Sequence, residues 1–404
     1  MNYNNNHYIN LLLLVITMYL IFPSPFQSSQ FLLYPLTSIT IVLLIIGARK
    51  VHSIEIDNVI LLFVSFLIIL SILITFSILF NQENVSISSI IHSIKPIFFV
   101  LILIFSYLFS IGINKSVLFS KISRMALFLL IFQLLVGSLQ AMNFPLINEI
   151  YNSEKVTGIG GKLRVVGTLN NPNILAWTVS QLAVIMILFE KRKILKIVGI
   201  AIAVILIILS GSRSFIVLLP IIISFVYLFK SLRSVSRIFL AIPIFLVAIL
   251  SSLKIIEWFI YRYQHIFPYL SQLTNVFETG DLRSVNSFNL RISIWENGLE
   301  RLGNSWLFGV GPNTIKYGLD NDYLYALINY GLVYLIIQTA MYLLMLIWFL
   351  NYKDRNIRML GLQAILFSFV ISFQADTISG WFYPILILFY LGISVGMLTN
   401  SQKE

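Results

Sequence analysis

Arginines at the ends of apolar segments are the residues of this chain best suited to chemistry. Arg213 lies in a short polar break, residues 210–214, between two strongly apolar segments. A guanidinium there can hold a phosphate through two parallel hydrogen bonds, and charge close to a membrane interior usually marks a function. The alternative is an arginine that only reaches toward lipid headgroups.

A second arginine, Arg164, lies in a stretch rich in glycine and asparagine, residues 160–173. Glycine permits close approach of the backbone to a ligand, and Pro172 suits the first turn of a helix, whose N-terminal amides attract anions. This stretch can therefore hold an anionic group beside Arg164. A plain turn followed by a helix start is the alternative, and the stretch lacks the Gly-Lys-Ser/Thr ending of a nucleotide phosphate loop.

A third group begins at Arg291 and Trp295. Asn286 or Ser287 can cap a helix that runs to about Leu302, and this helix would place Arg291 and Trp295 one turn apart on the same face. The sequence therefore predicts that a cation and an aromatic ring project together from this segment.

Acidic residues accompany this third group. Asp320 or Asp322 can accept a proton from a sugar hydroxyl, although neighbouring arginines would lower the basicity of a carboxylate. Either residue can instead serve only as the cap of the following helix. Glu296 and Glu300 lie on the preceding helix and are rival bases.

The sequence offers few residues for metal binding, cofactor binding or thiol chemistry. The four histidines are scattered, with no HExxH pairing, and the chain contains no cysteine. The Asp320/Asp322 spacing resembles a DxD motif, but we expect it on the outer face, away from cytosolic nucleotide sugars. We predict neither a metal site nor a cofactor.

The composition indicates a membrane protein. Only 11% of the 404 residues are charged and 58% are hydrophobic, whereas a soluble domain carries about a quarter charged residues. Apolar runs such as 59–79 are long enough to cross a ~30 Å hydrocarbon core, and helices satisfy their own backbone hydrogen bonds in lipid. We predict one integral membrane domain over residues 1–404, all-α, with about twelve transmembrane helices. They lie near 7–22, 30–47, 58–80, 96–112, 124–142, 172–189, 194–210, 214–229, 238–254, 322–350, 359–375 and 380–397.

The basic residues predict an orientation for these helices. The net charge of +11 comes from short basic clusters between apolar runs, which argues for topology and against nucleic-acid binding. Most of the 27 basic residues fall in connections that face the cytoplasm if both termini do. Two longer connections then face outward: residues 143–171, and residues 255–321 between the ninth and tenth spans. We expect the second to be helical and to fold against the membrane surface.

Taken in order, these groups make the chain resemble the O-antigen ligase and Wzy-type polysaccharide polymerase superfamily. The resemblance extends over nearly the whole chain, and the expected architecture is the GT-C-like polymerase/ligase fold. The parts that carry it are residues 164–173, the break before Arg213, Arg291 with Trp295, Gly309 and Gly311, and the run Asp320-Asn321-x-Tyr323-Leu324-x-x-Leu327-x-x-x-Gly331-Leu332.

The resemblance implies a glycosyltransferase of a bacterial inner membrane. Its donor would be an oligosaccharide on undecaprenyl diphosphate, no metal would be needed, and the active face would be periplasmic. Other partners would be membrane lipid and, in the same pathway, a chain-length regulator and a flippase. The implied catalytic residues are Arg213, Arg291, Asp320 and Asn321, and the implied substrate-binding residues are Arg164, Asn170, Asn173, Trp295, Glu296 and Tyr323.

One departure from the family pattern bears on the type of enzyme. Ligases of this family carry His-Asn where this chain has Asp320-Asn321. The departure favours a polymerase of O-antigen or capsular polysaccharide over a ligase that transfers finished polysaccharide to lipid A core. A flippase or transporter for lipid-linked oligosaccharide is the alternative from another class, although such proteins usually show repeated halves, broken helices and charges near mid-bilayer.

Overall fold

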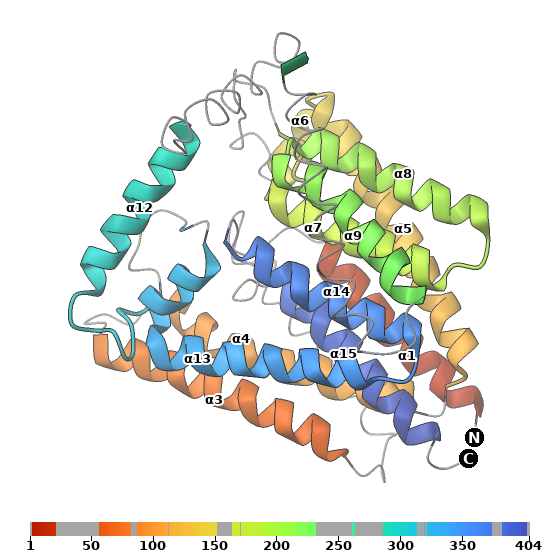
Figure 1. The fold of residues 1–404 in the computed structure, drawn as a ribbon, viewed down its shortest axis with the longest axis horizontal. Coiled ribbons are helices and arrows are strands. Elements are labelled where there is room, and N and C mark those ends of the chain that lie inside the picture. Colours follow the sequence, from red (N-terminus) through yellow and green to blue (C-terminus); the bar gives the residue numbers. More distant parts are fainter. Residues whose placement is uncertain are drawn as a thin grey trace.

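The computed structural model has helices and their connections, and no strands, in the residues that it describes. These are residues 2–21, 56–81, 87–111, 113–151, 164–169, 171–231, 261–262, 286–312, 319, 321–373 and 382–401. The helices, shown in Figure 1, are α1 (Asn2–Ile21), α3 (Asn58–Asn81), α4 (Ile87–Ser110), α5 (Lys115–Ala141), α6 (Pro145–Ile150), α7 (Pro172–Phe189), α8 (Lys193–Ser210), α9 (Arg213–Ser231), α12 (Asn286–Leu302), α13 (Asp322–Asn351), α14 (Arg355–Ile371) and α15 (Phe382–Ser401).

Ten of the twelve predicted spans coincide with helices, and the spans at 30–47 and 238–254 lie outside the described residues. Within the described part of the chain, six helices are long and apolar enough to cross a membrane, and three further apolar helices are shorter. The chain is therefore a helical protein of membrane-embedded character, while the number twelve stays a prediction.

Two helices begin nine residues earlier than the apolar runs predicted. α4 starts nine residues before the predicted boundary at 96, with Pro96 inside the helix, and α5 starts at Lys115 instead of 124. Asn114 caps α5, because its side chain accepts a hydrogen bond from the amide of Ser116. Hydropathy locates the part of a helix that lies in lipid, whereas polar caps and the first turns extend beyond it.

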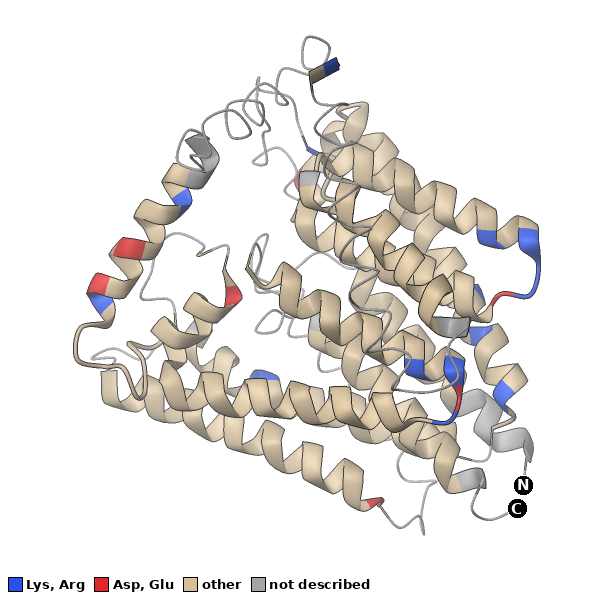
Figure 2. Ribbon diagram, viewed as in Figure 1, with Lys and Arg blue, Asp and Glu red and all other residues tan. Residues whose placement is uncertain are grey.

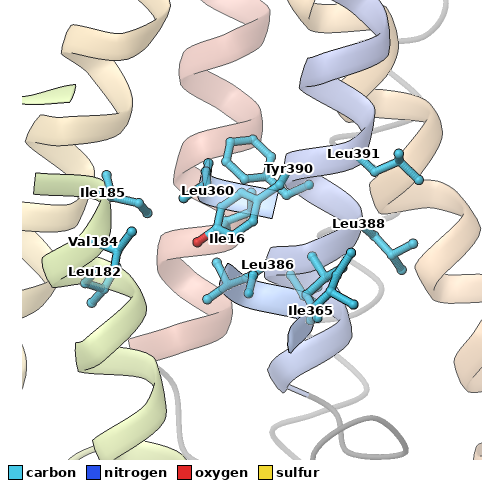
Figure 3. Close-up of a cluster of buried hydrophobic side chains, with 14 of the residues drawn as sticks. Ile16, Leu182, Val184, Ile185, Leu360, Ile365, Leu386, Leu388, Tyr390 and Leu391 are labelled. Carbon is cyan, nitrogen blue, oxygen red and sulfur yellow. The ribbon is translucent and has the colours of Figure 1, made fainter. Parts of the chain in front are cut away.

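A central helix organises the packing. α7 packs against α5, α8, α9 and α14, and almost all of its side chains are buried. Figure 3 shows residues of α1, α7, α14 and α15 meeting in the core, among them Ile16, Leu182, Leu360 and Tyr390. By contrast, α3 keeps large apolar side chains exposed, as expected of a helix that faces lipid; they include Leu61, Ile68, Ile72, Phe76, Leu79 and Phe80.

The bundle has one end that is strongly basic (Figure 2). The start of α5, the α7–α8 connection and the α13–α14 connection meet there, because Ser123 donates a hydrogen bond to Glu190 over 2.7 Å and Lys115 pairs with Asp354. We call this the basic end. Its cations are Lys115, Lys121, Arg124, Lys191, Arg192, Lys193, Lys196, Lys353, Arg355 and Arg358.

The opposite end holds the ends of α1, α5 and α8 and the starts of α7 and α9. We call it the site end. α14 runs antiparallel to α7, with Gln181 and Gln363 exchanging side-chain hydrogen bonds of 3.0 and 2.6 Å, so its last turn lies at the site end as well. There the Ser372 carbonyl accepts a 2.7 Å hydrogen bond from the amide of Asp322, which brings the start of α13 to the same end.

α13 is broken within its apolar length. Gly331 has φ 87° and ψ 174°, which is not helical. The carbonyls of Ile328 and Asn329 accept hydrogen bonds from the amides of Val310 and Gly311, at 2.8 and 3.0 Å. The segment 305–312 at the end of the long connection thus satisfies backbone groups that the break releases, as lipid surroundings require.

Candidate active site

The segment that carries Arg164 is buried between helices at the site end. Residues Val165 to Leu169 are almost fully enclosed. Gln140 of α5 accepts hydrogen bonds from the amides of Val166 and Gly167, at 3.1 and 2.9 Å, and donates to the Gly167 carbonyl over 2.8 Å. A side chain of α5 therefore fixes the backbone next to Arg164.

Arg164 contacts the polar break that the sequence singled out. Its Nε donates a 2.9 Å hydrogen bond to the carbonyl of Ser210, the last residue of α8. Gly211 follows with φ 60°, a conformation that glycine adopts at little cost, and α9 begins two residues later at Arg213. The structure thus brings Arg164 to the break that positions the backbone of Arg213, whose side chain lies outside the description.

Asn173 joins the same group from the start of α7. Its Oδ1 accepts a 2.8 Å hydrogen bond from the hydroxyl of Ser212, the residue before Arg213. Pro172 occupies the first turn of α7, as predicted, and Asn171 is the cap, because its side chain accepts from the amides of Asn173 and Ile174. Two separate sequence motifs, 164–173 and 210–213, therefore form one local structure.

The third group lies on α12 and at the start of α13. Arg291 and Trp295 are both half-buried on α12, one turn apart as predicted, while Glu296 is exposed. Trp295 Nε1 donates a 3.3 Å hydrogen bond to the Leu319 carbonyl, which ties α12 to the residues before α13. α12 packs on α13, and Figure 1 shows it separated from α7, α8 and α9 across the view.

The cap of α13 corrects one prediction. Asn321 caps the helix, with its side chain accepting a 3.1 Å hydrogen bond from the amide of Leu324, and Asp322 does not. Asp322 is instead the first helical residue and is buried. The side-chain amide of Asn321 caps the helix without a charge. The carboxylate of Asp322 lies at the positive end of the helix dipole, which favours a negative charge. Both residues therefore have a local structural role.

Tyr323 is anchored to the end of α14. Its hydroxyl donates a 2.8 Å hydrogen bond to the Phe369 carbonyl, and its ring lies 4.8 Å from that of Phe373, centroid to centroid. These contacts hold the start of α13 against α14 at the site end. Asn170 and Asp320 lie outside the described residues, so their predicted roles stay predictions, as does a shared site for Arg291, Arg164 and Arg213.

Sequence reasoning missed a polar cluster inside the bundle. His92 and Lys95 of α4 are both buried, and His92 Nδ1 lies 2.9 Å from the hydroxyl of Tyr330. A cavity of about 20 Å³, room for roughly one water, is lined by Lys95 and by polar side chains of α13, namely Tyr330, Tyr334, Gln338 and Tyr342. The signal was the His92–Lys95 spacing of one helical turn, which an assumed start at residue 96 placed outside the helix.

In the described part of the chain, no group of three or more histidine, acidic or cysteine side chains could hold a metal ion. Comparison of the chain with models of protein families and with curated proteins found no match.

Proposed function

We propose that the protein is a glycosyltransferase that polymerises oligosaccharide repeat units carried on undecaprenyl diphosphate. In this reaction a hydroxyl of the incoming unit attacks the anomeric carbon of the growing chain. The bond from that carbon to the diphosphate breaks and the lipid diphosphate leaves with the bonding electrons, while the hydroxyl proton passes to a basic side chain or to the departing diphosphate. The product would be O-antigen or capsular polysaccharide on the outer face of a bacterial inner membrane.

The observation that carries the proposal is the meeting of residues 164–173 with the break at 210–213. Arg164 is fixed at the carbonyl that ends α8, and Asn173 is fixed at the residue before Arg213. A leaving diphosphate gains negative charge in the transition state, and prearranged guanidinium groups favour that charge more than they favour the intact donor. This arrangement supports a site for a phosphorylated lipid at the site end.

Replacing single arginines tests the proposal. We expect Arg164→Ala, Arg213→Ala and Arg291→Ala each to slow polymerisation about 100-fold, the usual effect of removing one donor to a developing charge. In cells this appears as loss of long polysaccharide and accumulation of single repeat units. Arg301→Ala is the matched control, because Arg301 is an exposed residue in the last turn of α12. Long chains of normal length in all three site variants would refute the assignment.

A transporter for the same lipid-linked sugar is the second candidate. Two observations favour it: α13 is broken at Gly331, and His92 and Lys95 are buried within an apolar helix. Both features are common in secondary transporters. The discriminating experiment supplies purified protein in detergent with a defined lipid-linked repeat. A polymerase extends it without a membrane, whereas a transporter leaves its length unchanged.

A ligase is the rival within the resembled superfamily. A strain that lacks a ligase keeps long chains on the lipid carrier, whereas a strain that lacks a polymerase holds single units. Gel analysis of the lipid-linked pool in a deletion strain therefore separates these two enzymes.

A further inference from the structure

A recess lies at the basic end of the bundle, away from the candidate active site. Its volume is about 950 Å³, which falls within the range of small-molecule sites. The start of α5, the connection from α7 to α8 and one residue of α14 form it. The lining residues that matter below are Lys115, Phe119, Arg124, Glu190, Lys191 and Arg192.

The recess has an apolar floor. The rings of Phe119 and Phe189 stack with their centroids 4.2 Å apart, and Lys115 Nζ lies 5.6 Å from the centroid of the Phe119 ring. Stacked rings of two different helices, α5 and α7, give the floor a fixed shape. The polar lining includes Ser120 and Ser123.

The single acidic residue of the lining is already engaged. Glu190 accepts hydrogen bonds from the Ser123 hydroxyl at 2.7 Å and from the amides of Lys191 and Arg192 at 3.0 Å each. Burial raises the pKa of the Glu190 carboxyl, but these hydrogen bonds and the nearby Arg192 guanidinium outweigh burial and leave the pKa below its ordinary value. The carboxylate thus stays ionised at neutral pH and orders the backbone that presents the cations.

The remaining charge of the lining is positive. Lys115, Arg124, Lys191 and Arg192 are all exposed, and Lys196 also lines the recess. Five basic side chains and one acid thus line the recess, and its hydroxyl and amide groups can also donate hydrogen bonds. Lys115 pairs with Asp354, which lies outside the lining, and Arg192 pairs with Glu190, so Arg124, Lys191 and Lys196 are the cations of the lining without an ion pair to either acid. This is the chemistry that binds phosphate, because guanidinium and ammonium groups form strong hydrogen bonds to its oxygens.

Exposed apolar side chains lie at the same end of the bundle. Ile194 and Ile197, in the first turns of α8, expose 75% and 66% of their surface, and Val117 of α5 exposes 38%. Side chains of this kind are stable next to acyl chains and unfavourable in water. A ligand that combines an anionic headgroup with apolar chains therefore matches this surface better than a small soluble anion.

We propose that this recess binds the phosphodiester headgroup of an anionic phospholipid, with its acyl chains along α5 and α8. The cations of the α7–α8 connection contact the phosphate, and the stacked Phe119 and Phe189 rings support the headgroup from below. The site is independent of the glycosyltransferase proposal, since it needs only a membrane and lies at the other end of the bundle. Basic pockets between helices are known to select such headgroups.

The test compares two double variants in detergent-purified protein. Lys191→Gln/Arg192→Gln removes two cations of the recess, and Lys353→Gln/Arg355→Gln removes two exposed cations of the same end outside it. Native mass spectrometry measures the affinity for phosphatidylglycerol against phosphatidylcholine. At about fivefold for each cation, we expect the recess variant to bind phosphatidylglycerol roughly 25-fold more weakly and the control to change less than about threefold.

Inorganic phosphate separates the two sources of a phosphate group. We expect about 10 mM phosphate to leave phosphatidylglycerol bound, because the acyl chains contribute to affinity. Complete displacement by phosphate would overturn the assignment to a lipid. Equal loss of affinity in both double variants would overturn the recess itself, since general surface charge would then explain the binding. Unchanged melting temperatures of both variants confirm that the folded proteins are being compared.

Discussion

Two buried glutamines of α5 decide where Arg164 lies. The side-chain oxygen of Gln140 accepts from the amides of Val166 and Gly167, and its nitrogen donates to the Gly167 carbonyl. Gln133 accepts a 3.1 Å hydrogen bond from the amide of Thr168. A buried turn has backbone groups that must find partners away from water. The side-chain amides of Gln133 and Gln140 are these partners, so two residues with no predicted catalytic role position Arg164 of the candidate site.

Replacing Gln140 with alanine should release this turn. The amides of Val166 and Gly167 and the Gly167 carbonyl lose their partner, and unpaired buried groups cost about 2–4 kcal/mol of unfolding free energy here. Hydrogen exchange followed by mass spectrometry should show faster exchange in residues 164–169. Gln363→Ala, which breaks the pair with Gln181, is the matched control and should leave exchange in this turn unchanged. Equal exchange in both variants would contradict this role of Gln140.

The break in α13 depends on two glycines, Gly331 of α13 and Gly309 of the segment 305–312 that packs on it. A Cβ on Gly331 would lie 2.2 Å from the Leu307 carbonyl oxygen, and one on Gly309 would lie 2.5 Å from the carbonyl carbon of Asn329. Both residues also have positive φ, 87° and 70°. The backbone of residues 305–312 therefore packs directly on the backbone of α13, with no room for side chains between the two.

Gly331→Ala should prevent this docking. The backbone atoms at 2.2 Å cannot yield as a flexible side chain does, and the positive φ adds strain of about 1–3 kcal/mol. We expect little folded protein, measured as the monodisperse fraction in size-exclusion chromatography after detergent extraction. Gly199→Ala on α8 is the control: its Cβ would lie 3.0 Å from Cγ of the flexible Met186 side chain, and alanine favours helix. Normal yield of Gly331→Ala would show that the connection does not need this close approach.

At the scale of the whole molecule, charge is distributed between two ends of one bundle. The cations of the basic end lie in three connections that the fold brings together, whereas the arginine motifs at 164 and 213 lie at the site end. Basic residues in short loops favour the cytoplasmic side of a membrane. We therefore predict that the basic end faces the cytoplasm and that the site end, with the candidate active site, faces outward.

Single cysteines test this orientation, because the chain has no cysteine of its own. Lys193→Cys lies at the start of α8, at the basic end, and Met142→Cys follows the last residue of α5, at the site end, where Met142 is 79% exposed. A membrane-impermeant maleimide should label Met142→Cys in cells with an opened outer membrane and an intact inner membrane. Lys193→Cys should react only after the inner membrane is permeabilised. The reverse pattern would invert the topology and move the candidate site to the cytoplasm.

Local features of the chain were enough to locate most of the described helices. The bounds of α7 and α8 agree with the predicted spans to within a residue, because a chain in lipid must satisfy each backbone group within its own helix. The same local physics predicted the helix of Arg291 and Trp295 and the proline in the first turn of α7. Apolar length, caps and proline are properties of neighbouring residues, so a single sequence is enough to show them.

Which segments contact one another became known only from the packing of the helices. The contact of Arg164 with the Ser210 carbonyl, the docking of residues 305–312 on the broken α13, and the burial of Lys95 beside Tyr330 each join segments far apart in the chain. A backbone carbonyl accepts the first contact, and backbone amides and carbonyls make the second; nearly every residue carries these groups. The sequence therefore does not indicate which backbone groups make these contacts, because the contacts follow from the way the helices pack.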